Sequence, residues 1–302
     1  MKNSIVLLLI LLSISAFGQK TELRYNLEPG KEYFQEIQTE SKISQHIMGM
    51  DMEVSNKMSM NLGYKVINKE GRYYDMEVRY LYMSMEMETP YGRNSISSDS
   101  DEENNPLARM LDRVINVPFG IRMRDDGKVT EIKNIDVILN NMMEDMADIA
   151  DPMTMQIGAQ LQQQFGESAV KSQIENYSRI FPEGPVAKGD QWEKTMGMSS
   201  MLPMNISTIY QFMGDRDGFH HIQGLSEITS SDMSEELSGM NMTMNMGGNQ
   251  TFSALLDKGS GWIAEGTVIQ HVSGDVYAQN PLDGESISFT MNISTNVTIK
   301  GR

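Results

Sequence analysis

The sequence predicts a mainly β, β-rich α+β protein in which two related, curved antiparallel sheets flank a helical segment. Methionines alternate with polar residues in several places, the apolar period becomes helical from Asn134, and one turn-and-strand pattern occurs twice, at 27–33 and 186–192. Each copy has a turn glycine, a polar pair and a large aromatic residue that opens a strand. The expected organisation is a signal peptide at 1–18, a β half at 19–133, a helical segment at 134–181 and a second β half at 182–302.

Residues 1–18 have the features of a secretory signal peptide. Lys2 precedes an apolar run at 5–12, and small residues end the segment at Ala16 and Gly18. The run is too short for a transmembrane span of roughly 20 residues, and no later stretch is longer. We therefore expect export to the periplasm or the extracellular space, with no transmembrane segment in the mature chain.

The composition restricts the chemistry and the partners. The 302 residues contain no cysteine, which excludes a lipoprotein anchor, disulfides and thiol chemistry. A chain of this length can bury enough core without covalent links. The formal net charge of -16 disfavours nucleic acid and anionic membrane surfaces as partners.

The placement of the 28 methionines indicates strands. Methionines alternate with other residues in four segments, 48–52, 58–60, 83–87 and 240–246. Since successive side chains of a strand point to opposite faces, each set lies on one face of a half-buried strand.

The N-terminal half is predicted to form a series of antiparallel strands. Expected strands are 33–47, 48–67 and 72–87, with a hairpin turn at 68–71 before the third. The polar stretch 90–106 predicts an exposed loop. Asp125-Asp126-Gly127 predicts a tight turn between strands 119–124 and 128–132, because glycine adopts positive φ without strain.

Helices are expected from Asn134 to Phe181. The first carries an apolar stripe, a second restarts at Asp151-Pro152, and a third begins near Ser168. Pro182 ends the helical segment, because the residue before a proline disfavours helical geometry.

The C-terminal half returns to strands. Expected strands are 204–213, 219–228, 240–246, 250–256, 262–273, 275–279 and 286–300. A turn is expected at 214–218 and a polar loop at 230–239.

Several turn and strand-opening residues resemble those of a known family. These are Pro29-Gly-Lys-Glu-Tyr33, Phe181-Pro182, Pro185-Val186 and Gly189-Asp-Gln-Trp192, together with the signal peptide and the helical middle. They are similar to a family of secreted Gram-negative bacterial proteins catalogued only as a domain of unknown function. The resemblance covers nearly all of the mature chain and implies no activity and no functional residue.

The sequence lacks the familiar catalytic motifs. There is no nucleophile elbow, Walker loop, dinucleotide fingerprint or His-Glu-x-x-His. The neutral-pH bases are His46, His220, His221 and His271, and they lack the ligand spacing of a zinc site. Acidic clusters at 99–103 and 144–151 are typical of solvated surfaces. A non-catalytic binding or structural protein is therefore expected, with a hydrolase as an alternative.

The methionine strands leave three interpretations open. The thioethers fill the core, or they line a deformable pocket for an apolar ligand between sheet and helices, or they bind Cu(I). The strongest copper candidate is the set Met240, Met242, Met244 and Met246. Apart from Cu(I), no cofactor is expected, and the expected partner is an apolar small molecule or another envelope protein.

Overall fold

The computed structural model describes residues 20–47, 49–100, 105–146, 155, 158–159, 162–198, 204–230, 235–237, 240–279 and 286–302. The predicted signal peptide and the start of the second expected helix lie outside these residues. The strands in chain order are β1 (Glu32–Ile47), β2 (Met50–Glu70), β3 (Tyr73–Thr89), β4 (Gly92–Ser97), β5 (Phe119–Arg124), β6 (Val129–Lys133), β7 (Gln191–Met198), β8 (Met204–Arg216), β9 (Phe219–Ser230), β10 (Glu235–Leu237), β11 (Met240–Asp257), β12 (Ile263–Gln279) and β13 (Ser286–Gly301). The helices are α1 (Pro106–Asp112), α2 (Ile135–Met146) and α4 (Glu167–Ser178).

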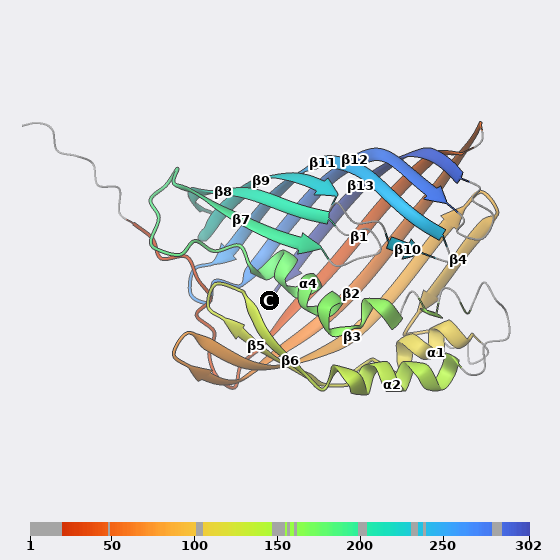
Figure 1. Cartoon of the computed structure of the whole chain (residues 1–302). Helices are drawn as coiled ribbons and strands as arrows, with labels where there is room; N and C mark the ends of the chain where they lie inside the picture. The colour runs from red at the N-terminus through yellow and green to blue at the C-terminus, as the bar shows by residue number, and fades with distance from the viewer. Residues whose placement is uncertain are drawn as a thin grey trace, which may run out of the picture.

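The strands form one antiparallel sheet, and the predicted mainly β class is confirmed. Its order is β6-β5-β3-β2-β1-β13-β12-β11-β9-β8-β7, with β4 on β3 and β10 on β11. Each half of the chain is a meander. The two halves join because the first strand pairs with the last, for example Ile37 with Ile299. The two expected sheets are thus the halves of one curved sheet (Figure 1).

Alternation along the strands gives the sheet a buried and a solvent-facing side. The buried side, here called the inner face, carries Tyr33, Ile37 and Met60, whereas Ile209 and Leu225 are exposed on the outer face. In Figure 1 the sheet arches over α4, and α1 and α2 lie below it. The hydrophobic core therefore lies between the inner face and these helices.

The loop expected at 90–106 is contradicted over 92–97, and residues 101–104 lie outside the described residues. Residues Gly92–Ser97 form β4, which pairs with the far end of β3, and Ile96 is buried. At the end of the same stretch, the Asn105 side chain caps α1 by accepting hydrogen bonds from the backbone N–H groups of Leu107 at 3.1 Å and Ala108 at 3.3 Å. The polar composition hid a strand because the only buried position of β4 is Ile96.

Two expected strand breaks are also wrong. The segments 240–246 and 250–256 form the single strand β11, and 262–273 and 275–279 belong to β12. A Cβ at Gly248 would lie 2.1 Å from the carbonyl oxygen of His271, and one at Gly274 would lie 2.1 Å from that of Asn245. Because Gly248 and Gly274 have no side chain, the backbones of β11 and β12 can approach closely at these positions. The two glycines therefore lie inside continuous strands and are not strand ends.

The tight turn expected at 125–127 and the helix starting after Asn134 are confirmed. The turns expected at 68–71 and 214–218 are shorter than predicted, because β2 extends to Glu70 and β8 to Arg216, and they lie at 71–72 and 217–218. Gly71, Gly127 and Gly218 have positive φ, as the tight turns require, and Gly214 has positive φ at a register shift within β8. The third expected helix corresponds to α4. The polar loop expected at 230–239 contains the short strand β10.

Candidate functional site

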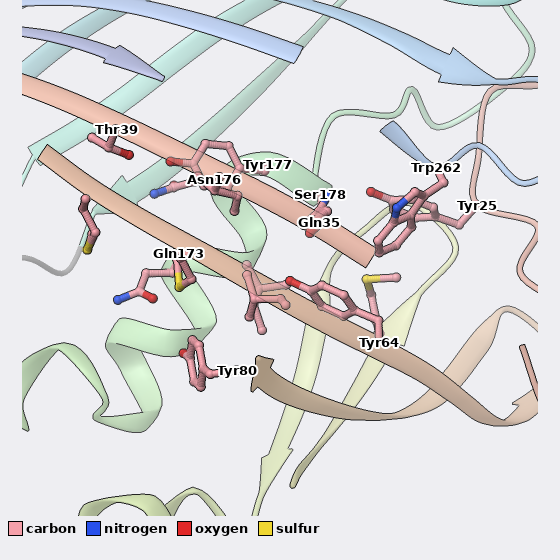
Figure 2. A pocket seen from close by; sticks show the side chains of 16 residues that line it. Tyr25, Gln35, Thr39, Tyr64, Tyr80, Gln173, Asn176, Tyr177, Ser178 and Trp262 are labelled. Carbon is pink, nitrogen blue, oxygen red and sulfur yellow. The ribbon is translucent and has the colours of Figure 1, made fainter. Parts of the chain in front are cut away.

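A cavity lies between the inner face of β1–β3 and helix α4 (Figure 2). Its volume is about 120 Å³. One buried water requires roughly 10–15 Å³ of cavity volume measured in the same way. The cavity therefore has room for about ten waters. The residues lining it come from β1, β2, β3, β5, α4 and the segments around Tyr25 and Trp262.

The walls of the cavity are largely apolar. Ile37 of β1 lies opposite Met60 of β2 in the sheet register, and Met58 lies one pleat further along β2. Met123 of β5 and Ile174 of α4 complete the apolar lining. One of the alternating methionine pairs seen in the sequence therefore contributes side chains to this cavity.

One end of the cavity is closed by an aromatic cluster around Trp262. The rings of Tyr33 and Tyr64 lie 5.2 Å from the Trp262 ring, and that of Tyr25 lies 5.9 Å away. The indole N–H donates a 3.0 Å hydrogen bond to the carbonyl oxygen of Phe34. This hydrogen bond fixes the orientation of the indole at the closed end.

Two polar side chains are buried at this closed end. Tyr25 is 1% exposed, and its hydroxyl has no hydrogen-bond partner among the described residues. Gln35 of β1 is 6% exposed and lines the same space. Burial raises the pKa of Tyr25 and of Tyr64, and it raises the pKa of Tyr177 to about 12. These phenols are therefore neutral at physiological pH and can donate hydrogen bonds.

Helix α4, which covers the cavity, is attached to the β5–β6 hairpin by its C-terminal half. The Glu175 carboxylate accepts a 2.8 Å hydrogen bond from the Val129 backbone N–H, and the Ser178 hydroxyl donates one of 2.7 Å to the Gly127 carbonyl. Just beyond the helix, the Trp192 indole donates to the Ile180 carbonyl at 2.9 Å. These bonds hold the cavity-facing residues Gln173, Asn176 and Tyr177 over the sheet.

A row of polar side chains crosses the inner face next to the cavity. Each member pairs in register with the next across eight neighbouring strands, and we call the row the polar belt: Lys194, Thr208, Ser226, Gln250, Gln270, Thr295, Ser41 and Asn56. Ser41 and Asn56 lie one pleat beyond Thr39 and Met58, which line the cavity. The belt divides the inner face into two apolar clusters.

Three hydrogen bonds link members of the belt. The hydroxyls of Thr208 and Ser226 are 2.8 Å apart, those of Ser41 and Thr295 are 3.0 Å apart, and the Gln250 amide donates to Ser226 at 3.4 Å. Thr208 is fully buried. Asn56 Oδ1 is buried without a partner in the described structure. Five of the eight members therefore form hydrogen bonds with one another.

Two of the four methionines predicted as copper ligands lie in the second apolar cluster. Met244 and Met246 of β11 are 8% and 3% exposed and pack with Ile228, Val272 and Val276. Met240 and Met242 belong to the same strand, but their side chains lie outside the described residues. The packing role accounts for the two described thioethers, and copper binding stays a prediction.

A cluster of charged residues surrounds the turn between β5 and β6. The buried Asp125 carboxylate accepts 3.0 Å hydrogen bonds at both oxygens from Arg72 Nε, and it pairs with Arg24 at 3.3 Å. Asp126 pairs with Arg124. Arg24, Arg72, Asp125 and Asp126 border a second, polar cavity of about 190 Å³. Because acidic and basic groups neutralise each other there, we interpret the cluster as a structural ion-pair network around the turn.

The four histidines lie away from the apolar cavity. His46 and His220 each pair with an aspartate at 2.7 Å near a hairpin turn, and His221 and His271 contact serines at 3.1 Å on the outer face. In the part of the chain that the structure describes, no three His, Asp or Glu side chains form a group that could hold a metal ion. The predicted acidic clusters lie partly outside the described residues, and Glu144 pairs with Arg113 at 2.8 Å.

The sequence matches the model of a known protein family. A model described as a family of unknown function (DUF6263) covers residues 71–263. The chain belongs to the DUF6263 family. This confirms the resemblance to a domain of unknown function. The matched range of DUF6263 runs from the β2–β3 turn to the start of β12 and includes α4. No curated protein matches the sequence.

Among solved structures, this DUF6263 protein is similar in fold to lipovitellin. The TM-score is 0.50 at 9% identity, and the match covers 92% of this chain and 25% of the lipovitellin chain. The chain therefore spans a quarter of the length of that protein. An outer membrane channel from Pseudomonas putida F1 gives a TM-score of 0.21 at 7% identity, covering 91% of this chain and 97% of the channel. That score supports no inference about fold.

The described helices of this DUF6263 protein are each too short or too polar to cross a lipid bilayer. The sequence alone did not single out Tyr25, Gln35 or Trp262 as residues of a site. They are brought together by the pairing of β1 with β13 and by the packing of the N-terminal segment, and no motif in the sequence signals that arrangement.

Proposed function

We propose that this DUF6263 protein is a non-catalytic binding protein that holds an apolar small molecule between the inner face of its sheet and α4. The observation that supports the proposal is the cavity of about 120 Å³ lined by Ile37, Met58, Met60 and Ile174. Concave sites with apolar walls and a few polar groups are typical of small-molecule binding. Thioether side chains are unbranched and polarizable, so they adapt to the shape of a ligand.

The fold is compatible with this role. Lipovitellin, whose structure was described for its lipid–protein interactions, resembles the chain over 92% of its length. At 9% identity the likeness concerns the fold alone. We extend the proposal to binding within the periplasm or outside the cell, because residues 1–18 have the pattern of a signal peptide.

Binding can be measured with N-phenyl-1-naphthylamine, an uncharged apolar dye whose fluorescence rises in an apolar site. We expect saturable binding by the parent protein. Met58→Trp should abolish binding, because the indole fills the space beside Met60. Met291→Trp is the matched control, since Met291 is a half-buried methionine of the inner face that does not line the cavity.

Two outcomes would overturn the proposal. One is a parent protein that does not bind the dye, and the other is a Met58→Trp variant that binds it as tightly as the parent does. Thermal unfolding of both tryptophan variants establishes that each is folded. Mass spectrometry of the protein purified from its native cells should, in addition, detect a co-purifying apolar molecule.

A further inference from the structure

We propose that the ligand of this cavity is an amphipathic molecule with an uncharged hydrogen-bonding group, which is bound by the Tyr25 hydroxyl and the Gln35 amide at the closed end. This inference rests on the proposed function and adds the chemical class of the ligand and its orientation. A hydroxyl, ester, amide or ketone group fits this description, and a carboxylate or a phosphate does not.

The first observation is the unpaired hydroxyl of Tyr25. The side chain is 1% exposed, and the hydroxyl lacks a hydrogen-bond partner in the described structure. A buried polar group without a partner costs about 1–3 kcal/mol. By contrast, the nearby Tyr74 hydroxyl donates to the Tyr25 carbonyl at 3.0 Å, and the Tyr33 hydroxyl accepts from the Glu28 N–H at 3.2 Å. Tyr25 thus brings to the cavity lining a buried hydroxyl that has no partner among the described residues.

The second observation is the change in burial along the cavity. Tyr25, Tyr64 and Gln35 are 1%, 4% and 6% exposed at the end near Trp262. Thr39 and Met58, at the other end, are only half-buried. A ligand therefore enters past Thr39 and Met58, and the group that meets Tyr25 is the part that is buried most deeply.

The third observation is the absence of charge from the lining. Among the 16 lining residues, all within the described structure, none is acidic, basic or histidine. Burying an ionised group without an opposite charge is far more costly than burying a neutral polar group that gains a hydrogen bond. The phenol of Tyr25 is neutral at pH 8, and burial raises its pKa further, so it offers a hydrogen bond without supplying a compensating charge.

The orientation follows from these three observations. The polar group of the ligand lies between Tyr25 and Gln35, with the Tyr64 ring beside it, as Figure 2 shows for the three side chains. The apolar part lies along Ile37, Met58 and Met60 toward the open end.

Three probes with the same chain length test this assignment by displacing N-phenyl-1-naphthylamine: 1-decanol, 1-chlorodecane and decanoate at pH 8. We expect 1-decanol to bind about fivefold more tightly than 1-chlorodecane, the effect of one net hydrogen bond. Decanoate should bind most weakly because its charge must be desolvated. Tyr25→Phe should remove the preference for 1-decanol and leave the affinity for 1-chlorodecane unchanged.

Tyr33→Phe is the matched control. Tyr33 is 2% exposed and contacts Trp262 like Tyr25, but it does not line the cavity. This variant should keep the full preference for 1-decanol. Thermal unfolding should show that Tyr25→Phe is at least as stable as the parent, because the substitution removes an unpaired buried hydroxyl.

The outcomes distinguish a failure of apolar binding from a failure of the assigned ligand class. If no probe displaces the dye, or if the dye itself does not bind, the proposed function fails. If the probes bind but 1-chlorodecane equals 1-decanol, or decanoate binds most tightly, the present inference is overturned while apolar binding stands. A Tyr25→Phe variant that retains the preference for 1-decanol would likewise overturn the role of Tyr25.

Discussion

Ser178 and Gly127 are in direct contact, although 51 positions separate them in the chain. The Ser178 hydroxyl donates a 2.7 Å hydrogen bond to the Gly127 carbonyl oxygen. A Cβ on Gly127 would lie 1.8 Å from the Ser178 carbonyl oxygen, and the φ of Gly127 is +87°. The position of α4 over the cavity thus depends on a glycine in the β5–β6 turn.

Gly127→Ala should destabilise the protein by about 2–4 kcal/mol, because the backbone is strained at positive φ and the new methyl group collides with α4. Gly30→Ala is the control: Gly30 has a φ of +85°, but a Cβ there would meet nothing within 4 Å. Strain alone should cost that variant about 1 kcal/mol. Urea unfolding measures the loss of stability in both variants. Equal losses in the two variants would show that the contact with Ser178 is not tight.

The polar belt should stabilise the sheet through mutual hydrogen bonds. Thr208→Val removes the 2.8 Å contact with Ser226 and should cost about 1–3 kcal/mol, because the serine hydroxyl stays buried. The double variant Thr208→Val/Ser226→Ala should cost less than the sum of the single changes. A double-mutant cycle in urea gives the coupling energy. Additive effects would mean that the two hydroxyls do not act as a pair.

The periodicity of the sequence was sufficient to predict most strands and the start of the first helix of the helical segment. The alternation of Met83, Met85 and Met87 with polar residues placed them on one side of β3, where Met83 is buried. The tight turn at Gly127 followed from the Asp-Asp-Gly signal. Local patterns of this kind succeed because the side-chain period reports directly on which face of a strand is buried.

The predictions from the sequence fail where contacts between distant parts of the chain determine the structure. Gly248 and Gly274 look like strand breaks, but each lies where β11 and β12 approach within a few ångströms. The strand β4 forms because β3 offers it an edge, not because its own residues favour a strand. The cavity joins residues as distant as Tyr25, Ile174 and Trp262, and no local period encodes their proximity.

Asp257 should contribute to stability in a pH-dependent way. Its pKa is lowered, chiefly by the 2.7 Å hydrogen bond from the Ser260 hydroxyl, with further bonds from the backbone N–H groups of Ser260 and Gly259. Because the folded pKa lies below the usual 3.8, the contribution is complete above about pH 4 and is lost as the pH falls through the folded value.

The test compares the melting temperatures of the parent and of Asp257→Asn between pH 2.5 and pH 7. The difference should be largest at neutral pH and shrink below pH 4, since protonation removes the same charge from the parent. Asp190→Asn is the control, because Asp190 also accepts a hydrogen bond in a turn, from Ala187 N–H at 2.9 Å, and lies away from Trp262. A difference that does not change with pH would contradict the assignment.

One alternative to apolar ligand binding is Cu(I) binding by the methionines of β11. If Met240, Met242, Met244 and Met246 form a thioether site, Met244→Leu/Met246→Leu should weaken Cu(I) binding in competition with a chelator, while Zn(II) and Ca(II) bind neither protein. Leucine nearly preserves the volume of methionine, so stability should change by less than about 1.5 kcal/mol. The control, Met58→Leu/Met60→Leu, removes an alternating pair from another strand and should retain Cu(I) binding. If the parent does not bind Cu(I), or if the β11 variant binds it equally well, Met244 and Met246 have the packing role in which they contact Val272 and Val276.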